Sequence, residues 1–205
     1  TQLGSLLGTR LNTLRIRGES MKKTLGELHT IMEKKEPGIY MFGDVGGGLF
    51  FSNNLGGYLG SSRYRATSET VRIGAAGKNA AGLSWSVSLD GGHVSSKSRH
   101  TVLSATGKQN IFGLSLSVGK RFEKTTFAMN GSVGHSRGKI TSSLPGSMQM
   151  DKLKTRVPET LFNVGGDVAY ALTEELSIAA SPQLWVCPKA TEKTSIGSQS
   201  AFRLK

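Results

Sequence analysis

After Ile39, apolar and small polar residues alternate with a period of two, and this constrains the fold more than any other feature of the chain. The clearest run is Leu83–Leu89, in which four apolar residues alternate with three serines. Such a period places the two kinds of residue on opposite faces of a β-strand. The same pattern recurs at Phe112–Gly119, Phe127–Gly134, Phe162–Tyr170 and Leu176–Leu184. The sequence therefore predicts an all-β, antiparallel protein.

The polar face of these predicted strands is made of serine, asparagine and glycine, with few charged residues. A soluble sheet usually presents charged side chains on the face that meets water. Small residues suit the concave wall of a barrel, whose interior can also hold a helix. Hydrophobic residues make up only 37% of the chain, which is little for a packed soluble core. We predict an up-and-down transmembrane β-barrel, which can be incomplete.

The first 35 residues have the period of a helix instead. One apolar stripe precedes Gly18 and a second follows it. Two lysines come just before Pro37 and Gly38, which end the helix. We therefore expect a helical linker or lumen helix at 1–36 and the β-barrel domain at 37–205, truncated at its C-terminus. The stripes consist of Leu3, Leu6, Leu7, Leu11 and Leu14, then Met21, Leu25, Leu28, Ile31 and Met32.

Turn-forming residues separate the predicted strands. Asp90-Gly91-Gly92 is a hairpin signal, and Lys120–Lys124 has the character of a short turn. A longer loop is expected at Ser142–Pro158. Near the start of the sheet, Leu55–Thr67 and Thr70–Ala76 are predicted as separate runs. About eight or nine strands follow from these boundaries.

Two hairpins resemble those of bacterial autotransporter β-domains, the outer-membrane part of type V secretion proteins. The first is Asn110–Ser117, followed by Lys120-Arg121-Phe122 and Thr126–Gly131. The second is the glycine-rich Phe162–Tyr170, followed by Leu172–Ile178 and Pro182-Gln183-Leu184. The segment Arg10–Arg15 is similar to the helix that joins passenger to barrel in that family.

This resemblance implies a twelve-stranded outer-membrane barrel of a Gram-negative bacterium, with a helix in its lumen. It also implies a function: the domain anchors and exports an N-terminal passenger. The partners would be outer-membrane lipid, the chain's own passenger segment and the barrel-assembly machinery. No nucleic acid is expected among them.

Possible chemical motifs do not combine into an active site. Gly134–Gly138 matches the G-x-S-x-G elbow by letter, but every histidine precedes Ser136, and we expect a turn after a strand instead. Gly43–Gly48 has no G-K-[ST] after it, so a flexible strand is expected there. His93 and His100 have no third ligand nearby, and the lone Cys187 is interpreted as inert. We expect no enzyme activity, and no catalytic, cofactor-binding or metal-binding residues.

The net charge of +12 leaves two alternatives open. One is a soluble basic β-domain that binds nucleic acid or an acidic polysaccharide, because arginines such as Arg63, Arg65 and Arg72 lie near aromatic residues. The other is a different small outer-membrane barrel, a porin or an adhesin. We interpret the aromatic residues as an interfacial girdle of a barrel instead. They are Tyr40, Phe42, Phe50, Phe51, Tyr58 and Tyr64.

Overall fold

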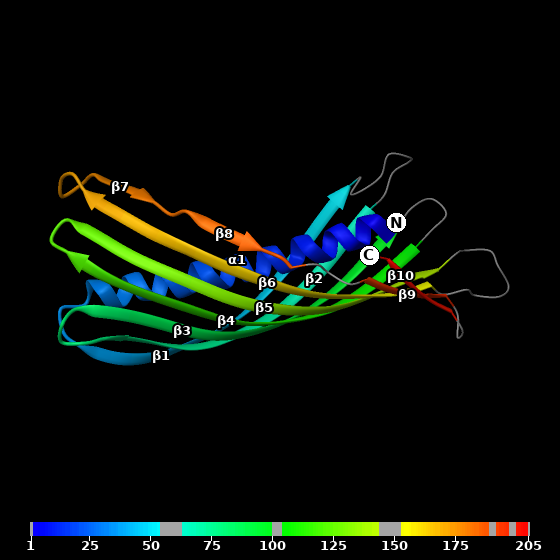
Figure 1. The fold of residues 1–205 in the computed structure, drawn as a ribbon, viewed down its shortest axis with the longest axis horizontal. Coiled ribbons are helices and arrows are strands. Elements are labelled where there is room, and N and C mark those ends of the chain that lie inside the picture. Colours follow the sequence, from blue (N-terminus) through cyan, green and yellow to red (C-terminus); the bar gives the residue numbers. More distant parts are fainter. Residues whose placement is uncertain are drawn as a thin grey trace.

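The protein folds as one long helix and a ten-stranded antiparallel sheet (Figure 1). The computed structural model describes residues 2–53, 63–99, 104–143, 153–188, 192–196 and 200–204. The elements are α1 (Gln2–Glu33), β1 (Gly38–Asn53), β2 (Arg63–Lys78), β3 (Leu83–Arg99), β4 (Ser104–Phe122), β5 (Thr125–Ser143), β6 (Leu153–Ala171), β7 (Ser177–Ala180), β8 (Gln183–Val186), β9 (Glu192–Ile196) and β10 (Ser200–Leu204).

Strands β1 to β6 pair with their neighbours in chain order, as the up-and-down prediction requires. Three later strands, β7, β8 and β9, all pair with different parts of β6, and β10 pairs with β9. Within the described residues β1 pairs only with β2, so the sheet is open along that edge. The strands curve around one side of α1, which runs along the length of the sheet (Figure 1).

The two ends of the sheet differ in their connections. Short turns at 79–82, 123–124 and 172–176 lie at one end, which we call the turn end. At the opposite end, the loop end, β1 joins β2, β3 joins β4 and β5 joins β6. Gly82 and Glu123 turn the chain with positive φ angles of 85° and 41°. Because β1 starts at the turn end, α1 runs from the loop end to the turn end.

Side chains divide cleanly between the two faces of the sheet. On β3, Ser84, Ser86 and Ser88 are buried against the helix side. The apolar residues that alternate with such serines point away from the helix, and Leu89 and Leu116 are 54% and 50% exposed. This confirms the predicted assignment of the two faces, because the small polar row lines the concave side.

One predicted turn is wrong. Asp90, Gly91 and Gly92 lie in the middle of β3, paired with β2 on one side and with β4 on the other. Asp90 continues the inward row of Ser84, Ser86 and Ser88, and it is only 8% exposed. Its carboxylate binds the helix rather than a turn amide, so the strand continues through residues that usually favour a hairpin.

Two other boundaries also differ from expectation. Strand β2 is continuous from Arg63 to Lys78, so the break before Thr70 is wrong, while residues 55–62 lie outside the described part. The expected loop Ser142–Pro158 is shorter, because β5 extends to Ser143 and β6 begins at Leu153. Pro158 is tolerated within β6. On the edge of β6 away from β5, the described pairings involve Leu153–Arg156 with β9 and Phe162–Gly165 with β8, so Pro158 takes part in neither.

Two apolar clusters join the helix to the sheet. Near the loop end, Ile16 packs with four residues of the wall. Near the turn end, Leu28, Ile31 and Met32 pack with Ala76 and Ala128. The second apolar stripe predicted for the helix therefore does face the sheet. The wall residues of the first cluster are Tyr64, Ala66, Val94 and Ile111.

Candidate functional site

A row of polar contacts joins α1 to the concave face of the sheet between the two apolar clusters. At its centre, the guanidinium of Arg17 forms an ion pair with Asp90 of β3. The side chains of Arg17 and Asp90 are 0% and 3% exposed. Arg17 also donates to the carbonyl oxygen of Leu114 at 3.3 Å and to Ser115 Oγ at 3.2 Å. The wall thus provides a carboxylate and two further acceptors for one buried cation.

Glycine creates the space that Arg17 occupies. Gly113 of β4 and Gly134 of β5 are direct partners across the two strands. A Cβ at Gly113 would lie 1.7 Å from Arg17 Nη1, and a Cβ at Gly134 would lie 2.6 Å from Arg17 Nε. Any larger residue at either position would occupy the volume of the guanidinium.

A second cation extends the polar row toward β1. Ser20 donates to Asp90 at 2.9 Å and accepts from Arg72 Nε at 3.3 Å. Arg72 of β2 also pairs with Asp44 of β1 at 3.0 Å, and Lys23 of the helix reaches the same carboxylate at 3.1 Å. Three cations and two carboxylates thus share one continuous network that links α1 with three strands.

Uncharged hydrogen bonds continue the interface toward the loop end. Gln109 of β4 donates to Thr13 Oγ1, to the carbonyl oxygen of Thr9 at 3.2 Å and to Ser136 Oγ at 2.6 Å. Asn12 Nδ2 donates to the hydroxyl of Tyr64 at 2.9 Å. These helix positions are buried although they are polar, because the wall that they meet is itself polar.

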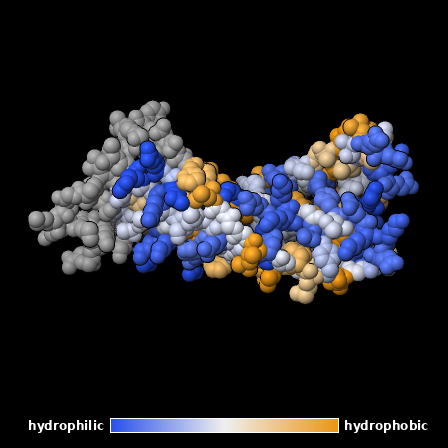
Figure 2. Space-filling view, turned by 180° about the vertical axis from the view of Figure 1, so that it is seen from behind, coloured by the Kyte–Doolittle hydropathy of each residue, from blue (hydrophilic) through white to orange (hydrophobic). Residues whose placement is uncertain are grey.

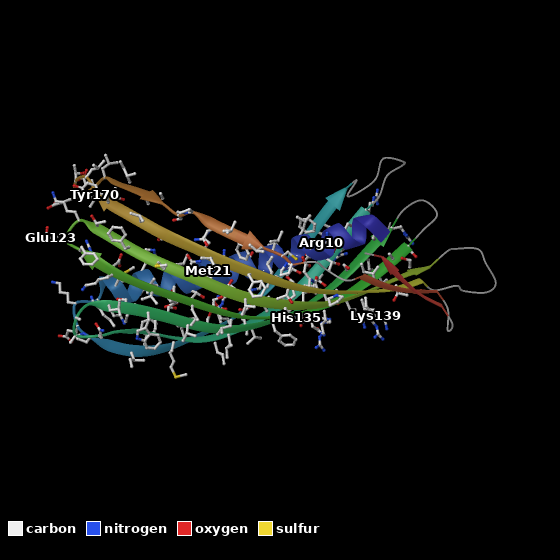
Figure 3. All side chains as sticks on the ribbon, in the orientation of Figure 1. Arg10, Met21, Glu123, His135, Lys139 and Tyr170 are labelled. Atoms are coloured by element: carbon white, nitrogen blue, oxygen red, sulfur yellow. The ribbon has the colours of Figure 1, made fainter. Side chains whose placement is uncertain are left out.

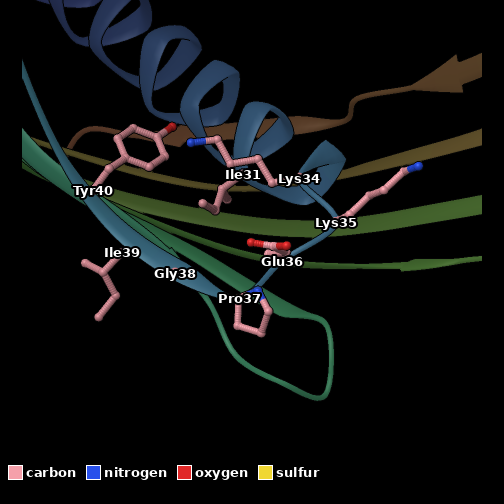
Figure 4. Close-up of a pocket in the computed structure, with 8 residues that line it drawn as sticks. All are labelled: Ile31, Lys34, Lys35, Glu36, Pro37, Gly38, Ile39 and Tyr40. Atoms are coloured by element: carbon pink, nitrogen blue, oxygen red, sulfur yellow. The ribbon is translucent and has the colours of Figure 1, made fainter.

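The turn end of the helix is fixed by different groups. Lys78 of β2 donates to the carbonyl oxygens of Met32 and Lys34 at 3.2 and 2.6 Å, which caps the helix C-terminus. His29 Nε2 and Oδ2 of Asp167 on β6 lie within hydrogen-bond distance, at 2.6 Å. A hollow of about 460 Å³ lies where the chain leaves the helix for β1, between Ile31, Lys34 and Tyr40 (Figure 4). Tyr40 bonds back to Glu27, so this junction is tied to the helix.

The first apolar stripe of the helix was expected to be the packing face, and there the structure differs. Leu11 and Leu14 are 44% and 41% exposed. The buried row over the same turns consists of polar residues, because the wall offers them hydrogen-bond partners such as Gln109, Ser115 and the Tyr64 hydroxyl. The side chains of Leu3, Leu6 and Leu7 lie outside the described part. The buried polar row is Thr9, Asn12, Thr13, Arg17, Ser20 and Thr24.

The outward face of β1 to β6 is apolar over the half of each strand near the turn end, and we call this surface the apolar belt. Met129 is 71% exposed, Val164 62% and Phe112 60%. The outward stretch Phe162–Tyr170 of β6 extends about 26 Å along the strand at the usual rise per residue. That is close to the height of the apolar band on outer-membrane barrels, roughly 25 Å. Space-filling atoms seen from behind show separate hydrophobic patches at the upper and lower margins of a largely hydrophilic face (Figure 2).

The predicted aromatic girdle is wrong for four of its members. Tyr40, Phe42, Phe50 and Tyr64 lie on the inward positions of β1 and β2, where they adjoin the helix. Phe51 points outward and is 61% exposed, and Tyr58 lies outside the described part. Three outward aromatic residues do lie at the turn end, near the labelled Glu123 and Tyr170 (Figure 3). They are Phe122, Phe127 and Tyr170.

The sequence segments that match catalytic, phosphate-binding or metal-binding motifs lie apart from one another. Gly134–Gly138 is inside β5 rather than at a turn, and Ser136 Oγ contacts Gln109. Gly43–Gly48 lies inside β1, as expected of a flexible strand. His93 binds Asn110, while His100 lies outside the described part. Within the described ranges, no three histidine, cysteine or acidic residues converge as a metal site would require.

Among the residues that the structure describes, no helix combines the length and the hydropathy that a membrane crossing needs.

Sequence reasoning missed the residues that form the polar row, above all Arg17 and Asp90. A signal was present in the alternation, because Asp90 keeps the parity of Ser84, Ser86 and Ser88. On the helix, Arg17 stands four residues after Thr13 and seven before Thr24, so the three share one face. Neither signal can identify the partner, since that depends on how the helix is placed in the sheet.

Comparison with known proteins gives a likeness in fold. No protein-family model and no curated protein matches the sequence. Among solved structures, the chain is similar to the translocator domain of the autotransporter NalP from Neisseria meningitidis, with a TM-score of 0.62 and 12% identity over 93% of this chain. The chain spans 64% of the length of that structure. The alcaligin outer-membrane receptor FauA from Bordetella pertussis has a TM-score of 0.46 and 15% identity, covering 84% of this chain and 29% of its own.

The resemblance inferred from two hairpins is therefore confirmed at the level of the fold. The NalP domain is a translocator domain, and the likeness covers nearly the whole chain. This chain has the fold of an autotransporter translocator β-domain.

Proposed function

We propose that the chain is an outer-membrane translocator β-domain of a Gram-negative bacterium, which anchors and exports an N-terminal passenger. The observation that carries the proposal is the distribution of polarity. Apolar side chains such as Met129 and Val164 are exposed on the outside, while Arg17 is fully buried inside. A wall of this kind suits hydrocarbon on one side and a hydrated lumen on the other.

The proposed orientation follows from the connections. Outer-membrane barrels have short periplasmic turns and longer extracellular loops. The turn end would then face the periplasm and the loop end the outside. Arg10 lies on the part of the helix toward the loop end (Figure 3), so a passenger attached before α1 would emerge at the cell surface. Residues 1–36 would form the lumen segment and 37–205 the barrel.

The partners follow from the same geometry. Lipid chains would contact the apolar belt, and the passenger would be continuous with α1. The barrel-assembly machinery would insert the strands, because unpaired strand edges are not tolerated in lipid. The polar row from Gln109 to Asp44 would hold α1 in place after export, since it combines buried ion pairs with hydrogen bonds.

Two alternatives fit the structure less well. A soluble polyanion-binding domain would expose an apolar belt on several adjacent strands to water, which favours aggregation. An open porin needs a free lumen, whereas α1 contacts the concave faces of β2, β3, β4 and β5. The proposed role is passive.

The proposal can be tested with two epitope tags in whole cells. One tag precedes Gln2, and the matched control tag is inserted in the turn at Glu123–Lys124. We expect the chain in the outer-membrane fraction, with the first tag digested by protease added to intact cells and the second protected. Recovery in the soluble fraction, or equal digestion of both tags, would contradict the proposal.

A further inference from the structure

Beyond the apolar belt, the outward face of the loop half of the sheet is basic. Among the side chains of β2 to β6 that the structure describes, eight on outward positions in the loop half are exposed lysines or arginines. On the same outward positions of these strands, Glu69 is the only carboxylate whose side chain the structure describes. Lys139 lies close to the loop end, and His135 is nearer to the middle (Figure 3). We call the eight residues the basic collar: Arg63, Arg65, Lys97, Arg99, Lys108, Arg137, Lys139 and Arg156.

The register brings like charges directly opposite one another. Arg63 pairs with Arg99, and Arg65 pairs with Lys97, across β2 and β3. Lys139 of β5 stands between Lys108 of β4 and Arg156 of β6. Like charges in directly opposite positions destabilise a sheet. Arg65 lies over the ring of Phe51. None of these cations has an ion pair with a described carboxylate, so no carboxylate of the described chain offsets the repulsion, and an external anion would do so.

Part of the collar frames a hollow of about 580 Å³ on the outer wall. Two rows of three residues cross β2, β3 and β4 there. One row is Arg65, Lys97 and Thr106, and the next is Thr67, Ser95 and Lys108. The long cations therefore surround short hydroxyl side chains. Three cations and three hydroxyls around one depression suit a phosphate group, which accepts hydrogen bonds from both kinds of donor.

A layer of mainly uncharged, hydrogen-bonding residues, which we call the neutral layer, lies between most of the collar and the apolar belt, with Glu69 and Arg137 in register with it. It contains cross-strand hydrogen-bonded pairs, His93 with Asn110 at 2.7 Å and His135 with Thr160 at 3.0 Å. From Phe112 to Lys108 the distance along β4 is about 13 Å at the usual rise. The outer wall is thus apolar, then neutral and hydrogen-bonding, then basic. A lipid with acyl chains, a sugar headgroup and phosphates has the same order of groups.

We propose that the basic collar binds the phosphates of a phosphorylated glycolipid in the outer leaflet, with the hollow between Arg65, Lys97 and Lys108 as its main site. This inference rests on the proposed function, which places the loop end at the outer surface. Sugar hydroxyls of the same lipid would meet the neutral layer, and its acyl chains would meet the belt. Bound phosphate would also remove the repulsion between opposed cations.

The test uses the full chain folded into zwitterionic phosphatidylcholine vesicles, with or without diphosphorylated lipid A. The variant is Arg65→Gln/Lys97→Gln/Lys108→Gln. The matched control, Lys35→Gln/Arg121→Gln/Lys124→Gln, removes the same charge at the turn end. We expect the collar variant to bind fluorescent lipid A roughly tenfold more weakly, the control to bind like the parent chain, and dephosphorylated lipid A to abolish the difference.

Stability provides a second readout that does not need a binding probe. In phosphatidylcholine alone, Lys97→Gln should raise the urea midpoint, because it removes repulsion from Arg65. With lipid A present, the same substitution should lower the midpoint, because a phosphate contact is lost. Equal binding by variant and control, or the same sign of change in both lipids, would overturn the proposal. So would tighter binding of single-stranded DNA than of lipid A to the collar.

The two proposals fail in different ways. If the chain inserts into phosphatidylcholine vesicles but ignores the phosphates of lipid A, the collar inference is wrong and the translocator proposal stands. If the chain does not insert into either vesicle, the translocator proposal is wrong and the collar inference falls with it.

Discussion

Arg17 of the helix and Asp90 of β3 form a fully enclosed ion pair, and no turn of the sheet lies near it. The pair connects the centre of α1 to the centre of the wall. Their contact joins one position on the helix to one position on the wall, so it fixes both the depth and the rotation of the helix in the sheet. The first two predictions concern this pair and the space around it.

Asp90→Asn should strongly destabilise the protein. The substitution leaves the Arg17 guanidinium buried without a countercharge, and loss of one partner of a buried pair costs about 3–5 kcal/mol. The measurement is the urea midpoint in vesicles, followed by tryptophan fluorescence. The double variant Arg17→Met/Asp90→Asn should recover a large part of the loss, because no unpaired charge remains. A single variant as stable as the parent chain would show that the pair does not anchor the helix.

Gly134→Val should displace Arg17 from the wall. The new Cβ would lie within 2.7 Å of Nε and Cδ of Arg17, whose side chain is fully buried. Overpacking of this kind costs about 1–3 kcal/mol, to which the weakened ion pair adds. Gly131→Val is the matched control on the same strand, since a Cβ there faces outward and meets only Asn163 O at 3.7 Å. Equal urea midpoints for the two variants would argue against a niche shaped by glycine.

These residues also show how far the sequence predicts the structure. Alternation correctly assigned the serines of β3 to the inside and Leu116 and Val168 to the outside, because period two depends only on strand geometry. The turn predicted at Asp90-Gly91-Gly92 is wrong. These residue types are typical of a turn, but Asp90 keeps the inward parity of the strand. On the helix, hydrophobicity correctly selected Leu28 and Ile31, which meet alanines of the wall.

The apolar pattern of the helix did not identify the buried face at Leu11 and Leu14, which are exposed. Which face of a helix is buried depends on the surface that it meets, and this surface presents hydrogen-bonding groups from several strands, such as Gln109 and Ser115. Polar helix residues then find partners in the wall, as Asn12 does with Tyr64. That complementarity belongs to the assembled sheet, so a local sequence window cannot reveal it.

Tyr64→Phe should have a smaller effect than loss of the ion pair. It removes the acceptor of Asn12 Nδ2 while it keeps the aromatic ring that packs with Ile16 and Phe50. A buried polar group left without its partner costs about 1–3 kcal/mol. Urea unfolding of Tyr64→Phe, Asn12→Leu and the double variant would give the coupling between the two positions. Strictly additive losses would mean that the 2.9 Å contact contributes nothing of its own.

Val164→Arg should destabilise the protein in lipid, because Val164 is 62% exposed within the outward apolar stretch Phe162–Tyr170 of β6. An arginine on the lipid face near the membrane midplane costs about 2–4 kcal/mol and much less near the interface. Thr160→Arg is the matched control, since it lies on the same face four residues nearer the loop end, beyond the belt. The vesicle urea midpoint should therefore fall for Val164→Arg and change little for Thr160→Arg. If both variants lose the same stability, the apolar belt does not lie in hydrocarbon, and the translocator proposal loses its main support.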